Sequence, residues 1–210
     1  MRFLLLLTLL ISPCSFGQDR QGYYITSNKQ RVEGYFRNSD ANSLKFKLNP
    51  IDKYETLDVR DVSEYGVEDA YKFIRRTVKI DKSDNINAKY YSTSKEPKFI
   101  TETLFLNVLV EGVSASLYSV KSNKSIRYFY TLVDKEQFSQ LIYKRYSLPD
   151  NIIGTSTLYK RQMYIDLNCN NKPEGYFIKI EYSRDDLTSA IKEFNTCAES
   201  NFIEYSNKWR

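Results

Sequence analysis

The stretch Leu104-Phe105-Leu106-Asn107-Val108-Leu109-Val110 decides the fold class of this chain. All of its residues except Asn107 are apolar, whereas a strand with one face in water alternates apolar and polar side chains. The stretch therefore predicts a β-strand that is buried on both faces. It runs through Glu111-Gly112 into Ser114-Ala115-Ser116-Leu117-Tyr118, which indicates a tight hairpin.

Further strands are expected on either side of this hairpin. β-branched and aromatic residues recur in short runs, separated by Asn, Asp, Ser, Lys and single Gly residues. The turn Ser27-Asn28-Lys29-Gln30 predicts a second hairpin, and the polar segment Ser83–Lys98 is expected to be the longest loop and the most mobile part. The nine expected strands are Gly22–Thr26, Arg31–Arg37, Ser43–Leu48, Glu55–Asp58, Val62–Val67, Phe73–Ile80, Thr103–Val110, Ser114–Val120 and Arg127–Thr131.

The period of the apolar residues changes at Asp134. Asp134 and Gln137 have the spacing of a capping box, and the residues after them predict a helix that ends before Leu148-Pro149. A second helix is expected over Ser156–Leu167. A third begins at Ser183 and presents an apolar face at helical spacing, made of Leu187, Ala190, Ile191 and Phe194.

These elements predict an α+β fold. A β-rich antiparallel N-terminal part, residues 18–133, is followed by a small helical C-terminal region, residues 134–210, that packs on it. A chain of 210 residues, of which 41% are hydrophobic, is long enough to bury such a core.

Residues 1–17 have the layout of a signal peptide. Arg2 precedes the apolar run Phe3–Ile11, and the small residues Ser15 and Gly17 suit cleavage after Gly17. No second apolar run reaches the roughly 18 residues that cross a bilayer, so no transmembrane helix is expected in the mature chain. We therefore expect an exported protein of the periplasm or the outer-membrane surface.

Two other interpretations of the N-terminus remain. The apolar run could form a buried helix of the folded protein. Alternatively, Cys14 could be acylated as in a lipoprotein, although Pro13 takes the place of the small residue that acylation needs.

The charge of the chain gives little reason to expect a nucleic-acid partner. The formal net charge of +5 falls to +4 when the expected leader with Arg2 is removed. The densest basic stretch, Lys72–Lys82, interleaves cations with aromatic residues, as in strands that bind single-stranded nucleic acid. An amphipathic strand with a cationic face in solvent explains it more simply, so no nucleic acid is expected.

The composition excludes much catalytic chemistry. The chain has no histidine, so a Ser-His-Asp triad, a Cys-His pair and a histidine zinc site are impossible. Its seven glycines all stand alone, so neither common phosphate-binding loop is present. Asp81–Asn87 resembles a calcium loop in composition, but it lacks the glycine and the terminal glutamate and is better explained as a turn. No cofactor and no metal ion is therefore expected.

A pair of carboxylates remains as a catalytic alternative, because glycosidases need only two of them. Nothing in the sequence marks two as partners, and charges facing solvent explain them as well. The available carboxylates are Glu96, Glu102, Glu111, Asp166 and Glu174.

Cys169 and Cys197 are the only cysteines left once the expected leader is removed, and each falls near the end of an expected helix. A single pair in an exported chain predicts a structural disulfide. The alternatives fit less well, because a redox pair usually has the C-x-x-C spacing and a zinc site needs four ligands.

Eighteen tyrosines are the most unusual feature of the composition. Tyrosine combines a rigid ring with a polar tip, which suits recognition of a glycan or a protein. The candidate binding surface consists of Tyr128 and Tyr130, together with Arg75 and Arg76 of the basic stretch, while Tyr90-Tyr91 is a second candidate. In the other interpretation the rings alternate along strands and belong to the core of the sheet.

A characteristic order of motifs runs through the chain from Gly22–Ile25 to Phe194–Cys197, by way of Val62–Val67, Tyr71–Asp81, Leu104–Gly112 and Arg127–Tyr130. This order resembles an uncharacterised family of exported proteins from flavobacteria and related Bacteroidetes. In longer members the region looks like an N-terminal periplasmic module that precedes an outer-membrane β-barrel. The resemblance therefore implies an outer-membrane or envelope protein as partner, and it supplies no catalytic residues.

The sequence favours a non-enzymatic periplasmic or cell-surface binding or accessory module. The alternative is a hydrolase that acts on glycans through a carboxylate pair. Such an enzyme requires a deep cleft with two carboxylates about 5 to 10 Å apart, whereas a binding module requires an exposed recognition surface.

Overall fold

A computed structural model describes residues 20–37, 44–68, 70–122 and 125–205 of the chain. The expected leader, its cleavage site and Cys14 lie outside the described residues. The strands are β1 Arg20–Thr26, β2 Arg31–Arg37, β3 Leu44–Lys47, β4 Glu55–Leu57, β5 Val62–Val67, β6 Tyr71–Asp81, β7 Phe99–Gly112, β8 Ala115–Ser122, β9 Ser125–Leu132, β10 Lys135–Leu141, β11 Lys144–Ser147, β12 Ile153–Ser156 and β13 Phe202–Glu204. The helices are α1 Leu158–Asp166, α2 Glu174–Ile178 and α3 Arg184–Cys197.

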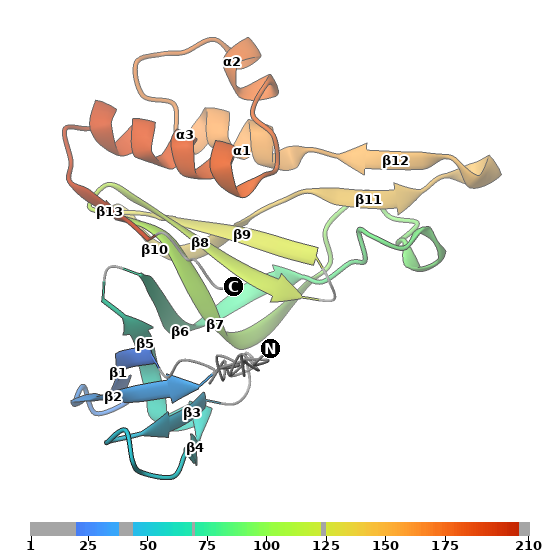
Figure 1. Cartoon of the computed structure of the whole chain (residues 1–210). Helices are drawn as coiled ribbons and strands as arrows, with labels where there is room; N and C mark the ends of the chain where they lie inside the picture. Colours follow the sequence, from blue (N-terminus) through green and yellow to red (C-terminus); the bar gives the residue numbers. More distant parts are fainter. Residues whose placement is uncertain (1–19, 38–43, 69, 123–124, 206–210) are drawn as a thin grey trace, which may run out of the picture.

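The fold is α+β, as the sequence predicts, and all nine expected strands are present. Within the described residues, one antiparallel sheet contains every strand except β11 and β12, in the order β10-β9-β8-β7-β6-β5-β1-β2-β3-β4, with β13 paired to β7. Helices α1 and α3 cover the part of the sheet around β8 and β9, while β1 to β5 form the other end of the molecule (Figure 1). β11 and β12 form a separate two-stranded ribbon that projects sideways (Figure 1).

Strand β7 is buried on both faces and connects the hydrophobic cores. Phe105 packs in the core at the β1–β5 end, Leu106 and Val108 in a core between β6, β8 and β9, and Leu109 and Val110 in the core under the helices. All five side chains are at most 7% exposed. Their burial confirms the prediction that this apolar stretch forms a strand buried on both faces.

The C-terminal strand β13 completes one edge of β7. β6 pairs with β7 only as far as Asn107, and β8 occupies the opposite edge. β13 pairs with Val110 to Gly112, and the Tyr205 amide donates to the Leu109 carbonyl at 3.0 Å. The edge of β7 that β6 leaves unpaired is therefore closed by a segment almost a hundred residues later in the chain.

Two of the three expected helices are confirmed. α1 occupies the middle of the range expected for the second helix. α3 begins as expected, because the Ser183 hydroxyl accepts a hydrogen bond from the Asp186 amide at 3.2 Å. The short helix α2 is not signalled by the sequence. Within the described ranges, no helix is both long and apolar enough to cross a membrane.

The prediction of a helix that begins at Asp134 is wrong. Lys135 pairs with Leu132 across a two-residue turn, so the segment becomes β10 on the edge of β9, and β11 follows it. Phe138 packs on Tyr118 with ring centroids 4.9 Å apart, which is a contact across the sheet. Such tertiary contacts outweigh a weak local helical pattern, and the strands consequently continue to Ser156.

Asn195 anchors α3 to the turn of the β7–β8 hairpin. It is fully buried; its Oδ1 accepts from the Ser114 and Ala115 amides at 3.1 Å, and its Nδ2 donates to the Ala115 carbonyl at 2.8 Å. A Cβ on Gly112 would lie 2.4 Å from Asn195 Oδ1, so a side chain there would block this contact. One amide side chain thus satisfies three backbone groups of the hairpin.

The segment Ser83–Lys98 is a loop, as expected, and a buried polar cluster holds it against the strands. Arg127 is 2% exposed; its Nε donates to the Asp81 carbonyl at 3.1 Å and its Nη2 to the Ser83 carbonyl. Lys144, also 2% exposed, lies 3.6 Å from the Asp81 carboxylate and donates to the Glu96 carbonyl at 2.6 Å. Burial lowers the pKa of the Arg127 guanidinium.

Candidate functional site

The largest of three hollows that we describe is a groove beside α1, here called the α1 groove. Its volume is about 330 Å³, within the range of small-molecule sites. Phe99 and Ile165 are 46% and 64% exposed, so apolar surface lines an opening to solvent. The lining residues are Pro97, Phe99, Ile142, Leu158, Arg161, Gln162, Ile165 and Asp166.

Hydrogen bonds between α1 and the end of β10 hold the two sides of the α1 groove together. Gln162 Oε1 accepts from the Ile142 amide at 2.9 Å, and Gln162 Nε2 donates to the Gln140 carbonyl at 2.9 Å. The Tyr159 amide donates to the Ile142 carbonyl at 2.9 Å. Both ends of the Gln162 amide are therefore bonded to the backbone at β10, and this side chain fixes the shape of the groove.

Asp166, at one end of the groove, is already neutralised by the protein. Tyr130 donates its hydroxyl to Asp166 Oδ2, and Lys135 Nζ lies 2.8 Å from Oδ1. Partial burial raises the pKa of Asp166, but the hydrogen bonds from Lys135 and Tyr130 outweigh this, and the net pKa lies below its usual range. Burial and the hydrogen bond to Asp166 raise the pKa of the Tyr130 hydroxyl.

Arg161 differs from the other polar residues of the groove. Its side chain is exposed, and no residue within the described ranges forms a hydrogen bond or an ion pair with it. A guanidinium carries five donors and stays charged at every physiological pH. Arg161 is thus the charge in this groove that is available to a ligand, and it favours an anion.

The lowered pKa of Asp166 predicts a pH dependence of stability. We expect Asp166→Asn to reduce the free energy of unfolding at pH 7 by about 1 kcal/mol, because the ion pair with Lys135 is lost. A carboxyl group whose pKa is lower in the folded than in the unfolded state stabilises the fold at pH values above its unfolded-state pKa. The difference in stability between the wild-type protein and Asp166→Asn should therefore shrink as the pH falls from about 4 through the folded-state pKa. Urea unfolding at several pH values measures it, and a difference that is constant down to pH 2 would contradict the assignment.

The structure does not place Tyr128 and Tyr130 on a surface. They are 4% and 3% exposed and belong to the core under the helices, where the Tyr128 ring meets Tyr182 edge-on at 5.1 Å. The expectation that they form a binding surface is therefore wrong, and the interpretation as sheet core is correct. The two rings share a face because they are two residues apart on β9, and this is the face that the helices cover.

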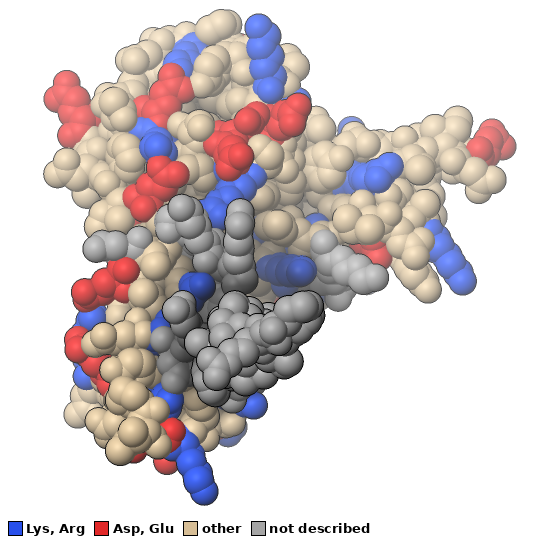
Figure 2. Space-filling view, in the orientation of Figure 1, with Lys and Arg blue, Asp and Glu red and all other residues tan. Residues whose placement is uncertain are grey.

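Arg75 and Arg76 do not join the two tyrosines. They are neighbours on β6, so their side chains leave opposite faces of the sheet. Arg75 donates to the Arg60 carbonyl at 3.1 Å, whereas Arg76 is exposed and its guanidinium lies 5.8 Å from the Phe138 ring. On the face that Figure 2 shows, basic and acidic side chains are interspersed. In the second candidate, Tyr90 is 62% exposed but Tyr91 only 8%, so that pair offers a single ring.

The candidate carboxylates do not converge on a cleft. Of the five candidates, only Asp166 lines one of the three hollows, and Glu96, Glu102, Glu111 and Glu174 line none of them. The acidic residues of the other two hollows, Glu193 and Asp81, are not among the candidates. Glu102 pairs with Lys82 at 2.5 Å, away from all three.

The candidate Glu111 shares a cation with Glu64, a carboxylate that the sequence does not single out. Lys72 bridges them, with Nζ 2.9 Å from Glu111 and 3.6 Å from Glu64. The Tyr23 hydroxyl donates to Glu64 at 2.8 Å, and the Tyr205 hydroxyl donates to Glu111 at 2.9 Å. A cation between two hydrogen-bonded carboxylates is a compensated network, and it lines none of the three hollows, so it does not resemble an acid and base pair.

The calcium-like segment uses its oxygen atoms within the protein. Asp81 Oδ1 accepts from the Ser83 amide at 2.8 Å, and Asp84 Oδ1 accepts from the amides of Ile86 and Asn87. These are the Asx-turn bonds expected of a turn. Among the described residues, no three side chains of Asp, Glu, Cys or His come together as a metal site.

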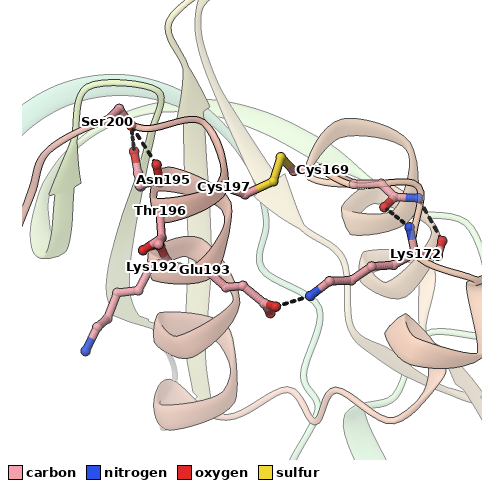
Figure 3. The surroundings of a disulfide bond; sticks show 9 residues. Cys169, Lys172, Lys192, Glu193, Asn195, Thr196, Cys197 and Ser200 are labelled. Carbon is pink, nitrogen blue, oxygen red and sulfur yellow. Dashed lines mark hydrogen bonds and ion pairs between the residues drawn. A yellow bond between two sulfur atoms is a disulfide. The ribbon is translucent and has the colours of Figure 1, made fainter.

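The disulfide between Cys169 and Cys197 is present, with Cα atoms 6.2 Å apart. It joins the turn after α1 to the last residue of α3, as expected (Figure 3). Lys172 and Tyr176 both contact the Glu193 carboxylate beside it. The neighbouring hollow has a volume of only about 40 Å³, which suits packing around a structural bond rather than a ligand.

The α1 groove combines three segments that are distant in the sequence, which is why sequence patterns do not reveal it. Pro97 ends the loop before β7 and Phe99 begins β7, Ile142 follows β10, and the other lining residues belong to α1. Comparisons of the chain with known protein families, curated proteins and solved structures found no match.

Proposed function

We propose that this chain is a non-catalytic binding module of the cell envelope, and that its ligand occupies the α1 groove. The observation that carries the proposal is an open apolar groove of about 330 Å³ in which Arg161 is the charge left available. Such a site suits a molecule with an apolar body and an anionic group, which is held by burial of apolar surface and by one charge-assisted contact.

The disulfide supports the cellular part of the proposal. Disulfides persist in oxidising compartments such as the periplasm, and the bond between Cys169 and Cys197 agrees with the expected export of the chain. The family resemblance adds an outer-membrane or envelope protein as the proposed partner. The hydrogen bonds of Gln162 hold the groove in its shape before any ligand binds, as expected of a module that binds a ligand without catalysing a reaction on it.

Octanoate is a suitable probe, because it joins a short apolar chain to a carboxylate. We expect octanoate to shift the NMR methyl signals of Ile142 and Ile165, which line the groove. Replacing Arg161 by Gln should weaken octanoate binding by at least about tenfold, since a hydrogen bond to a charged group contributes roughly 1.5 to 3 kcal/mol. Octyltrimethylammonium, which has the opposite charge, should bind weakly to both proteins.

Lys160→Gln is the matched control. Lys160 is the neighbouring cation on the same helix, but it does not line the groove and donates instead to the Ile178 carbonyl. This variant should bind octanoate as tightly as the wild-type protein does. The proposal fails if both variants weaken binding equally, or if the shifted methyl signals lie elsewhere in the protein.

A further inference from the structure

The ribbon of β11 and β12, here called the arm, has one covered edge and one uncovered edge. The loop before β7 covers β11, because Ser92 bridges Tyr146 and the Ser147 amide donates to the Ser92 carbonyl at 2.9 Å. Within the described residues, β12 pairs with β11 and with no other strand. The surface of the arm is largely uncharged in the view of Figure 2.

The hydrogen bonds of the arm show which backbone groups of β12 point outward. The Leu148 amide donates to the Ile152 carbonyl at 2.8 Å, and hydrogen-bonded and non-bonded pairs alternate along an antiparallel ladder. Since Ser147 lies opposite Ile153 and Arg145 opposite Thr155, these are the non-bonded pairs. The N–H and C=O groups of Ile153 and Thr155 therefore face away from β11.

This edge is short, but it carries no charge, proline or bulge that would protect it from pairing. Its sequence is Ile153-Gly154-Thr155-Ser156. Ile153 is 43% exposed, and at the tip of the arm Leu148 and Ile152 are 42% and 57% exposed. An unprotected strand edge next to exposed apolar side chains is a template for pairing with another strand.

We propose that β12 pairs antiparallel with β12 of a second copy of this chain, around a two-fold axis at Gly154. In this register, Ile153 of each copy pairs with Thr155 of the other, and all four outward groups on each strand are satisfied. The product is a four-stranded sheet made of two arms. A Cβ on Gly154 would lie 2.4 Å from a Tyr146 ring atom, so only glycine leaves room for that ring at the position where the axis passes.

Charge complementarity favours a second copy over an unrelated extended peptide. Because the two β12 strands run antiparallel, the tip of each arm, which carries Asp150, lies toward the end of the other copy's β12 from which α1 begins. The first turn of α1 contains Lys160 and Arg161 and no acidic residue, and Thr157 makes no side-chain capping bond. The carboxylate therefore comes to the positive end of a helix, twice in each dimer by symmetry.

Sedimentation velocity of the purified mature protein tests the proposal. We expect a dimer at about 100 µM protein, which needs a dissociation constant in the micromolar range. Ile153→Lys should raise that constant at least about tenfold, because it places like charges on a paired edge. Thr155→Pro should do the same by removing an outward N–H, while the bonds within the arm stay intact.

Ile51→Lys is the matched control, because Ile51 is 94% exposed and lies between β3 and β4 at the other end of the molecule. This variant should dimerise like the wild-type protein. Circular dichroism should show that Ile153→Lys and Thr155→Pro keep the fold. A protein that stays monomeric at this concentration, with or without an added extended peptide, overturns the proposal.

A cross-link tests the register itself. In a chain with both Ile153→Cys and Thr155→Cys, oxidation should give a covalent dimer in which residue 153 of one copy is joined to residue 155 of the other. Peptide mass spectrometry identifies the joined residues. A dimer that survives Ile153→Lys, or cross-links that join other positions, would show that a different surface makes the contact.

Discussion

Replacing Asn195 by alanine is expected to lower the free energy of unfolding by roughly 4 kcal/mol, since each buried polar group left without a partner costs about 1 to 3 kcal/mol. The truncation deprives the Ser114 and Ala115 amides and the Ala115 carbonyl of their partner. Asn195 is fully buried, so the truncated side chain also leaves a cavity between α3 and the hairpin. Urea unfolding followed by circular dichroism measures the loss.

Thr196→Ala is the control for this prediction, because Thr196 is the next residue of α3. Its hydroxyl donates to the Lys192 carbonyl on the exposed side of the helix. We expect its replacement to change the stability by less than about 0.5 kcal/mol. If Asn195→Ala costs no more than Thr196→Ala, then the amide does not anchor α3.

Removing the disulfide is expected to be the second most damaging change. Cys169 and Cys197 are 28 residues apart, and closing a loop of that length stabilises the folded state by about 3.6 kcal/mol in the chain-entropy model. Replacing both by serine should lower the melting temperature by roughly 10 °C for a chain of this size. The β-rich part should keep its fold, because the cores at β1–β5 and around β6 are formed without α3.

Reduction of the wild-type protein is the control for the serine substitutions. The reduced protein should melt near the temperature of the double variant, since both lack the same bond. Alkylation of the unreduced, denatured protein should label neither thiol. Labelling of both would show that the bond does not form, and an unchanged melting temperature in the double variant would show that it does not stabilise the fold.

The strands were predictable because their signals are local. The bounds of β2 and β5 agree with the sequence patterns to the residue, and the apolar stretch of β7 correctly indicates burial on two faces. β10 was not predictable, since its pairing with β9 is a tertiary contact and Asp134 with Gln137 imitates a helix start. β11 and β12 are four residues long, too short to show a period.

The candidate site was the less predictable part. Cys169 and Cys197 could be paired by elimination, because the expected mature chain contains no other cysteine. Tyr128 and Tyr130 were placed on a surface, yet composition does not tell which face of a strand the helices will cover. Asn195 had no signal at all, because an asparagine inside a helix looks like an exposed polar residue until its burial is known.

The pairing of β13 with β7 bears on how the chain reaches its native state. The edge of β7 at Val110 to Gly112 stays open until residues 202–204 pair with it, so completing the sheet needs a contact between segments some ninety residues apart. Contacts of this separation slow folding, and an exposed edge beside an apolar strand invites association with other chains meanwhile. A chain delivered from its N-terminus therefore has its most vulnerable period just before its C-terminal strand is released.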